Sequence, residues 1–196
     1  MEATDAPKDL QKETEVIEQL KTAFPATILE SQVGRKNRPR VVISLEDALP
    51  ILRYAKDTQG FEHLSAVIGI DMIDYFAVAY MLGSWSNGLM LEVLVRINDL
   101  ENPTLPSVTS LWETANWHER EVFDLFGFKF TDHPDLKRIV LPEEWDDPDQ
   151  FPHEDPDILH PLRKSYKQPE NPFRLTRKVD ETREHIDINQ WRKTIE

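Results

Sequence analysis

The sequence predicts an α+β fold with an antiparallel or mixed sheet, flanking helices and an extended C-terminal tail. Helical periodicity lies before and after a run of three strand patterns instead of alternating with them, which favours α+β over a doubly wound sheet. Two of these strands are joined at residues 85–88 by Trp-Ser-Asn-Gly, and Asn-Gly accepts the positive φ angles of a tight hairpin. A length of 196 residues fits one domain with tails.

The first helix is expected at residues 10–24, where Pro25 ends it. Its apolar side consists of Leu10, Ile17, Leu20 and Phe24. Two strands should follow at 26–33 and 40–43, joined by a basic turn. A second helix then runs to about residue 58. We prefer Asp47 to Ser44 as its N-cap, because Pro50 then falls in the first turn, where no amide hydrogen is needed.

Three strands are expected at residues 63–72, 75–82 and 89–97, and the middle one should be central because both of its alternating sets are apolar. Alternation places five residues of the first strand on one face of the sheet: Leu64, Ala66, Ile68, Ile70 and Met72. In the last strand the inward residues should be Leu89, Leu91, Val93, Val95 and Ile97. The third helix should open with a capping box at Ser110 and Glu113 and end at Phe126, before Gly127.

The chain divides into four parts on composition. Residues 1–9 should be a disordered N-terminus, and residues 10–145 the folded domain. Residues 146–159 are interpreted as an acidic, proline-rich insertion. The overlapping run at 143–157 holds eight acids, three prolines and no Lys or Arg. Residues 160–196 should be a C-terminal extension, which has too few apolar residues for a core of its own and is expected to lie along a partner.

Composition excludes several classes of function. A net charge of −13 disfavours binding to nucleic acid and to anionic lipid, so any membrane contact should be indirect. The absence of cysteine removes thiolate nucleophiles, Cys-ligated zinc and iron–sulfur clusters held by this chain. The N-terminal residues lack the pattern of a signal peptide. The most apolar stretch, residues 66–83, contains two aspartates, which argues against a membrane span.

The catalytic and metal-binding alternatives rest on few residues. No two of the six histidines have the i, i+4 spacing of a helical metal site, and no Gly-rich phosphate loop or nucleophile elbow occurs. A stand-alone hydrolase would depend on a carboxylate pair, Glu119 and Asp124, with a metal at His118. A free acidic adaptor module is a third possibility. We expect no catalytic, cofactor-binding or metal-binding residues in this chain.

The third helix carries charges that oppose its dipole. Glu121 and Asp124 lie in its last turns, where acids are disfavoured. Compensating cations could come from this chain or from a partner, and the candidates in this chain are Lys129, Lys137 and Arg138. Arg120 and Asp124 have i, i+4 spacing and should form a weak exposed pair. We therefore expect the face with Glu119, Arg120, Glu121 and Asp124 to be a contact surface.

Three runs in the second half of the chain resemble a known family. They are EREVFDLFG at residues 119–127, HPDLKRIVLPEEW at 133–145 and HPLRK at 160–164, preceded by Trp112-x-x-Ala115-x-Trp117. Together they resemble the signature of the 30 kDa (C) subunit of respiratory complex I, the proton-pumping NADH:quinone oxidoreductase (NDH-1). The resemblance extends in layout to about residue 164 and is sharp from residue 112 onward.

The resemblance implies a non-catalytic structural and assembly subunit in the peripheral arm of the complex. It implies contact with the 49 kDa (D) subunit and neighbouring Fe–S subunits, at the cytoplasmic face of a bacterial-type inner or plasma membrane. FMN, the iron–sulfur clusters and quinone would belong to the complex and not to this chain. Signature residues would then contact partners, and the expected interface set is Glu119, Arg120, Glu121, Asp124, His133, Lys137, Arg138, His160, Arg163 and Lys164.

Three features depart from the family pattern. Lys137 stands where the family usually has arginine, and Ser165 replaces an acid that often follows Arg-Lys. The segment at residues 146–159 is longer than the corresponding segment in most of the family. These departures concern local contacts and not membership of the family. Relatives also occur in ferredoxin-, F420- and hydrogenase-linked complexes, so the electron donor of the complex stays open.

Overall fold

The computed structural model describes residues 10–143, 145 and 159–166. The predicted N-terminal segment 1–9, most of the acidic insertion and the end of the tail lie outside these residues. The elements are α1 (Gln11–Ala23), β1 (Ile28–Gln32), β2 (Arg40–Ser44), α2 (Ala48–Asp57), β3 (His63–Asp71), β4 (Phe76–Gly83), β5 (Met90–Ile97), β6 (Thr104–Pro106), α3 (Ala115–Phe126) and β7 (Lys129–Thr131).

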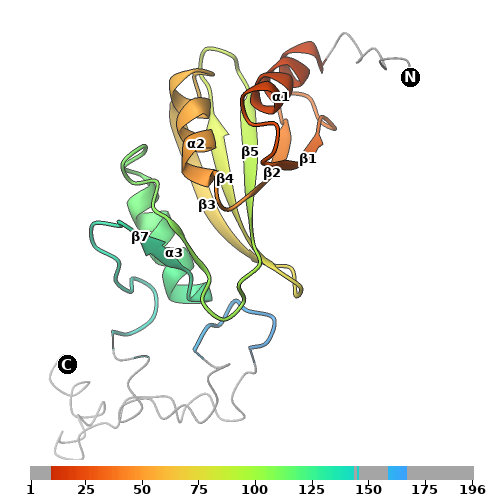
Figure 1. The fold of residues 1–196 in the computed structure, drawn as a ribbon. Coiled ribbons are helices and arrows are strands. Elements are labelled where there is room, and N and C mark those ends of the chain that lie inside the picture. Colours follow the sequence, from red (N-terminus) through yellow and green to blue (C-terminus); the bar gives the residue numbers. More distant parts are fainter. Residues whose placement is uncertain (1–9, 144, 146–158, 167–196) are drawn as a thin grey trace, which may run out of the picture.

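Five strands form one mixed sheet in the order β1-β2-β5-β4-β3 (Figure 1). The pairs β3–β4, β4–β5 and β1–β2 are antiparallel, while β2 and β5 run parallel. β6 and β7 form a separate parallel pair beside α3. The predicted α+β class with a mixed sheet is confirmed. The β4–β5 turn is also as predicted, with Gly88 at φ 68°.

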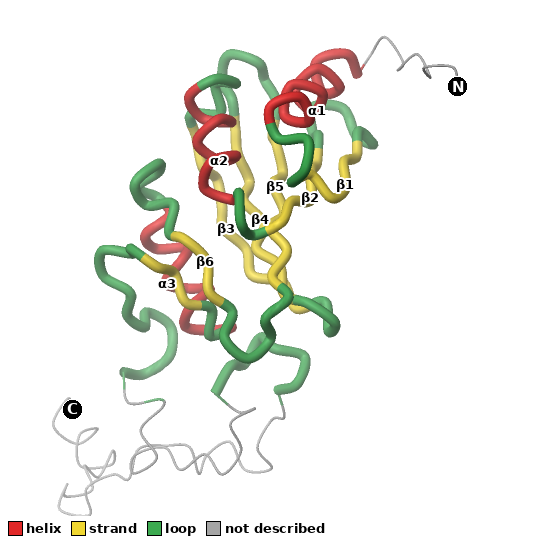
Figure 2. The backbone as a smooth tube through the Cα atoms, viewed as in Figure 1, coloured by secondary structure: helices red, strands yellow, loops and turns green. Residues whose placement is uncertain are grey.

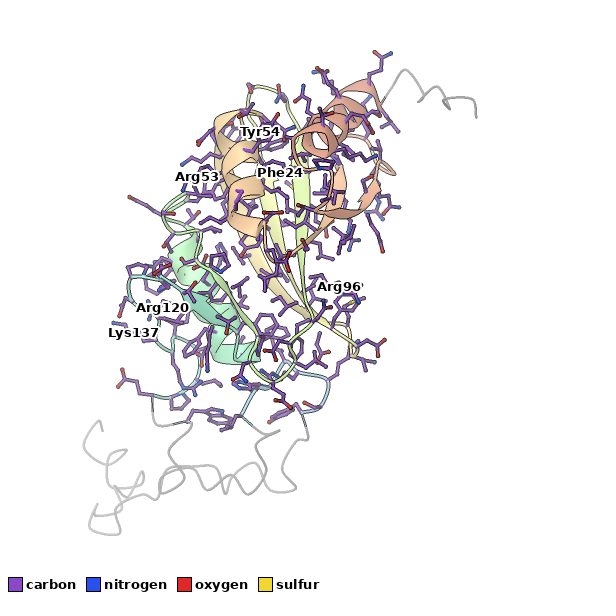
Figure 3. All side chains as sticks on the ribbon, viewed as in Figure 1. Phe24, Arg53, Tyr54, Arg96, Arg120 and Lys137 are labelled. Atoms are coloured by element: carbon purple, nitrogen blue, oxygen red, sulfur yellow. The ribbon has the colours of Figure 1, made fainter. Side chains whose placement is uncertain are left out.

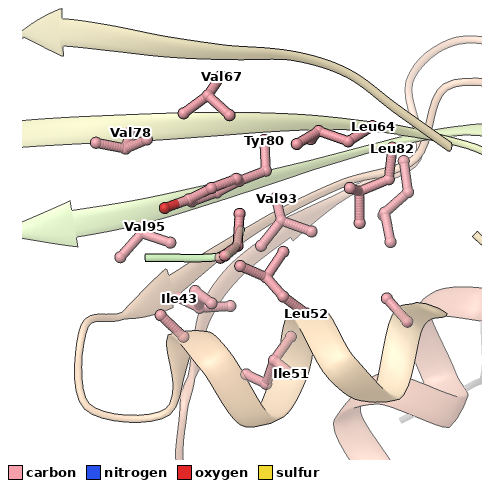
Figure 4. Packing of buried hydrophobic residues seen from close by; sticks show 14 of the residues in the cluster. Ile43, Ile51, Leu52, Leu64, Val67, Val78, Tyr80, Leu82, Val93 and Val95 are labelled. Atoms are coloured by element: carbon pink, nitrogen blue, oxygen red, sulfur yellow. The ribbon is translucent and has the colours of Figure 1, made fainter. Parts of the chain in front are cut away.

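The main core lies between the sheet and the helices. Ile51 and Leu52 of α2 point toward the side chains of β2, β4 and β5 (Figure 4). The inward set predicted for residues 89–97 is confirmed, because all five side chains are at most 4% exposed. On α1, the core residues are Val16, Ile17 and Leu20. Phe24 then packs edge-on against Tyr54 of α2, with ring centroids 5.6 Å apart (Figure 3).

The single face predicted for residues 63–72 is wrong. A register shift between Leu64 and Ala66 inserts one residue into β3, which exchanges the two faces beyond it. Leu64 and Val67 therefore face the core, whereas Ile68 is 47% exposed. Alternation alone could not reveal this bulge, because a strict period of two keeps Leu64 on the same face as Ala66, Ile68, Ile70 and Met72.

The capping box predicted at Ser110 and Glu113 does not start a helix. α3 begins at Ala115 with Thr114 in the N-cap position, and the preceding residues form turns. Trp112 is fixed there because its indole Nε1 donates to the Glu62 carbonyl at 3.1 Å. The end of the helix is as predicted, since Gly127 takes the left-handed conformation, φ 74°.

Asp47 is the N-cap residue of α2, as preferred from the sequence. Its side chain does not cap the helix, however. The carboxylate instead accepts a hydrogen bond from the Thr27 hydroxyl, which ties the start of α2 to the chain just before β1.

Candidate functional site

The signature runs identified in the sequence come together around α3. The loop after β6, the segment at residues 133–141 and the segment at residues 159–166 all bind to this helix (Figure 2). Three charged side chains on α3 make most of these contacts, and we call them the anchoring residues: Glu119, Arg120 and Asp124. Each is buried within this chain.

Glu119 holds the loop after β6. Its carboxylate accepts hydrogen bonds from the Ser107 hydroxyl at 2.6 Å and from the Val108 amide at 2.8 Å. Burial raises the pKa of Glu119 from 4.5 to about 7, although these two hydrogen bonds lower it in part. Burial is the main cause that raises the pKa of Tyr80, and the charge of the nearby Glu119 carboxylate raises it further.

Arg120 holds the segment after β7. Its Nε donates to the Lys137 carbonyl at 3.0 Å, and Nη2 donates to the Arg138 carbonyl at 3.3 Å. The labelled Arg120 and Lys137 accordingly lie side by side in Figure 3. The guanidinium also lies 4.9 Å from the centre of the Trp117 ring. A planar group with several donors suits two adjacent carbonyls, which an ammonium group would not satisfy in the same way.

Asp124 binds the same segment one helical turn further along. One carboxylate oxygen accepts hydrogen bonds from three successive amides, those of Ile139 (3.1 Å), Val140 (2.7 Å) and Leu141 (2.9 Å). The other oxygen accepts from Nη1 of Arg138 at 2.9 Å. Burial alone would raise the pKa of Asp124, but these four hydrogen bonds outweigh it and hold the pKa below the ordinary 3.8.

Residues 159–166 close the C-terminal end of α3. The Leu162 amide donates to the Leu125 carbonyl at 3.2 Å, and Nε of Arg163 donates to the Phe126 carbonyl at 2.7 Å. The Lys164 amide then donates to the Asp71 carboxylate at the end of β3, at 2.7 Å. These bonds satisfy helix carbonyls that would otherwise have no partner. Residues 162–164 are thus hydrogen-bonded to their own domain.

His133 is held in place by two backbone groups. The Asp135 amide donates to Nδ1 at 3.0 Å, so the ring hydrogen belongs on Nε2, which lies 3.2 Å from the Asn116 carbonyl. Nε2 is also 4.0 Å from the Glu119 carboxylate. The histidine therefore links the chain after β7 to the first turns of α3.

The structure places part of the expected contact surface inside the domain. Glu119, Arg120 and Asp124 do not face solvent, and Arg120 and Asp124 do not pair with each other. The cation that neutralises Asp124 is Arg138, one of the three candidates named from the sequence. His133, His160 and Arg163 are also engaged with this chain.

The expected interface residues that remain exposed are Glu121, Lys137 and Lys164. Lys137 is 58% exposed and pairs with Asp135 at 2.8 Å. Sequence reasoning missed Ser107, Val108 and Asp71 as partners of the signature residues. Nothing in the local pattern marks them, because they lie 11 to 93 residues away along the chain.

The two carboxylates considered for hydrolysis, Glu119 and Asp124, bind different segments of the chain. Glu119 binds Ser107 and Val108, whereas Asp124 binds residues 138–141. Both side chains are fully buried, so their oxygens serve the chain's own donors. In the part of the chain that the structure describes, no group of three or more His, Asp or Glu residues is placed to hold a metal ion. The same part contains no helix long and apolar enough to span a membrane.

Comparison with known proteins agrees with this layout. Residues 41–172 match the family described as "Respiratory-chain NADH dehydrogenase, 30 Kd subunit". The C subunit of the NADH-quinone oxidoreductase of Roseiflexus sp. (strain RS-1) is 36% identical over 154 residues, which cover 76% of this chain and 80% of that protein. The C subunit of the F(420)H(2) dehydrogenase of Methanosarcina mazei is 32% identical, over 78% of this chain and 90% of that one.

A solved structure shows the same fold. A chain of the membrane-bound sulfane sulfur reductase, an archaeal respiratory membrane complex, superposes with a TM-score of 0.65 at 22% identity, over 81% of this chain and 87% of that one. The chain is thus a complex I-type subunit. It belongs to the 30 Kd subunit family of the respiratory-chain NADH dehydrogenase and is part of a multisubunit, membrane-associated respiratory complex.

Proposed function

We propose that this chain is a non-catalytic structural and assembly subunit in the peripheral arm of its complex. In this role it binds the 49 kDa (D) subunit and neighbouring Fe–S subunits, at the cytoplasmic face of the membrane. FMN, the iron–sulfur clusters and quinone are held by other subunits. The electron donor of the complex is NADH, and the alternative is a related ferredoxin-, F420- or hydrogenase-linked complex; one relative is a subunit of the F(420)H(2) dehydrogenase of Methanosarcina mazei.

The observation that carries this proposal is the use of the charged residues of α3. Glu119, Arg120 and Asp124 each make two or more hydrogen bonds to other segments of their own chain. Buried groups with that many internal partners fix segments in place and do not offer free atoms to a substrate. We call the two segments that bind to α3, residues 133–141 and 159–166, the anchored segments. They hold the exposed side chains of Lys137 and Lys164 in defined positions, and Glu121 is exposed on the helix itself.

Cross-linking of the native complex tests the partner. Lys137 and Lys164 should form amine-specific cross-links to the D subunit or to an Fe–S subunit beside it. Lys12 and Lys21 lie on α1, away from the anchored segments, and should show a different set of partners. Cross-links from Lys137 and Lys164 to membrane subunits alone would contradict the proposed position.

Charge reversal tests the surface. Lys137→Glu combined with Lys164→Glu should lower co-purification of the D subunit, whereas Lys21→Glu on α1 should not. The quinone reductase activity of each complex that still assembles should stay at the parental level, because neither lysine takes part in catalysis. A fall in activity per assembled complex with normal assembly would contradict a non-catalytic role.

A further inference from the structure

The face of the sheet opposite the helices carries a second set of apolar side chains. Strand register places Val42, Leu94, Ala79 and Ile68 side by side across β2, β5, β4 and β3. Ala77, Ala79 and Leu94 form a small apolar cluster of their own, separate from the main core. We call this surface the open face, because α1 and α2 pack on the other side (Figure 4).

The composition of the open face is unusual for a surface in water. The solvated face of an antiparallel sheet normally alternates to polar residues. Here the row across the sheet is apolar, and Ile68 at its edge is 47% exposed. In the middle of the row, Ala79 and Leu94 are only 2% and 3% exposed, and Val42, Ile70 and Tyr75 pack against their cluster. The apolar surface that this row exposes is therefore concentrated at Ile68, at the edge of the sheet.

One corner of the open face is basic although the whole chain has a net charge of −13. A hollow at this corner is lined by Arg35, Arg38 and Arg40, together with Met81 and Met90. Among the described residues that line it, Glu92 is the acidic one. Arg40 lies 3.6 Å from Glu92. Arg35 and Arg38 are exposed, and no ion pair or side-chain hydrogen bond engages either guanidinium within the described residues. We call these three arginines the arginine corner.

The backbone of this corner is fixed, so its charges have defined positions. The Asn37 amide donates to the buried carboxylate of Glu13 on α1 at 2.6 Å. The Asn37 carbonyl accepts from the Met90 amide at 2.8 Å, and the Pro39 carbonyl accepts from the Glu92 amide at 3.0 Å. The turn is therefore tied both to a helix and to the sheet. Arginines placed in this way are suited to bidentate contacts with carboxylates.

We propose that the open face and the arginine corner form a second docking surface, which binds an acidic segment of another protein subunit in the complex. The apolar part of that segment contacts Ile68 and the partly buried Val42. Two or more of its carboxylates pair with the arginine corner. This inference rests on the proposed structural role and adds a second contact to it, centred on the arginine corner.

Charge and shape favour a protein partner over a lipid surface. The net charge of −13 repels an anionic membrane or a nucleic acid, whereas the arginine corner acts only at close range, within a Debye length of about 8 Å at physiological salt. Methionine and arginine, which line the hollow at this corner, are enriched in protein interfaces.

Charge reversal in the assembled complex tests the arginine corner. Arg35→Glu combined with Arg38→Glu should lower incorporation of the chain at moderate salt by about tenfold or more, because rigidly placed carboxylates of the partner then face like charges. The matched control is Arg53→Glu, an exposed arginine on α2 that lies on the helix-covered side. It should incorporate at the parental level. Circular dichroism of each full-length variant should be unchanged, because both arginines of the corner are exposed. Equal incorporation of the double variant and the parent overturns the proposal.

A photo-cross-linking residue at Ile68 tests the apolar part and identifies the occupant. In the native complex it should cross-link to a protein segment in which apolar residues are followed within a few positions by Asp or Glu. Cross-links to lipid alone, to an acid-free segment or to no other subunit overturn the docking surface. If the chain still co-purifies with the complex in that case, the proposed structural role stands. If the chain does not co-purify at all, the proposed function itself fails.

Discussion

Asp124 is the most heavily bonded side chain in the site. Its four donors all come from residues 138–141, and three of them are backbone amides. The pKa of this carboxyl is lowered in the fold, so the charged form is the stabilising one. Its contribution is complete above the ordinary pKa of 3.8 and is lost as pH falls through the lower folded value.

We expect Asp124→Asn to destabilise the full-length chain by about 2–3 kcal/mol at pH 7, because a buried charge-assisted network loses its acceptor. Denaturant unfolding measures this loss. The control is Asp135→Asn, since Asp135 is exposed and pairs only with Lys137. That substitution should leave the unfolding free energy near the parental value, because an exposed ion pair contributes little. Equal effects of the two substitutions would contradict the anchoring role of Asp124.

Glu119 has the opposite dependence on pH. Its folded pKa of about 7 lies above the ordinary 4.5, so folding favours the protonated form. The stabilising contribution is therefore complete below pH 4.5 and is lost as pH rises through 7. The difference between the two pKa values corresponds to about 3 kcal/mol in total.

Glu119→Gln should remove this dependence. Glutamine keeps an acceptor for the Val108 amide and carries no charge, so the variant should be at least as stable as the parent at pH 8. Unfolding free energies at pH 5, 6, 7 and 8 measure the effect. A parental decline across this range that persists in the variant would show that Glu119 is not the group responsible.

At the scale of elements, α3 ties three segments to the domain. Arg120 is only 7% exposed and binds two carbonyls of the segment after β7, so its loss affects more than a surface pair. From the i, i+4 spacing with Asp124 alone, Arg120→Ala would be expected to leave the fold intact. The observed contacts instead predict that the substitution destabilises the fold.

Arg120→Ala should therefore cost about 2–4 kcal/mol and raise amide hydrogen exchange at residues 137–141. Glu121→Ala is the matched control, since Glu121 is the next residue on the same helix and is exposed. It should leave both the stability and the exchange rates near parental values. Unchanged exchange at 137–141 in Arg120→Ala would contradict the role assigned to this side chain.

Gly127 positions the segment that closes α3. A Cβ atom there would lie 2.3 Å from Nε2 of His160, and the residue also has φ 74°. Gly127→Ala should therefore displace residues 159–166 as well as strain the backbone, and limited proteolysis should cleave that segment faster. Gly88→Ala has a similar φ of 68° and no atom within 4 Å of the new Cβ, so it should show the backbone strain alone, of about 1 kcal/mol. Equal proteolysis of the two variants would contradict this assignment.

Local patterns predict the elements better than the site. The inward residues of β5, the hairpin at Gly88 and the end of α3 at Gly127 follow from short-range rules, and all three are confirmed. The charges of α3 resemble a solvated face in the sequence because their partners are loop amides and carbonyls 11 to 18 residues away. No residue type marks a backbone donor as a partner, so burial of Glu119 and Asp124 is not predictable from spacing.

At the scale of the whole molecule, we propose two regions of contact with other subunits. The first includes the exposed Lys137 and Lys164, and the second is centred on the arginine corner at the turn between β1 and β2. A chain with fixed contacts in two regions can hold neighbouring subunits in a defined relation.

Native mass spectrometry of the complex purified through a tag on this chain is the most direct test of the structural role. The account predicts a stoichiometric assembly with complex I-type Fe–S subunits, in which the dissociated chain has its bare sequence mass and reduces no quinone. A monomeric chain, or a dissociated chain that retains a flavin or cluster and turns over a substrate alone, would contradict it.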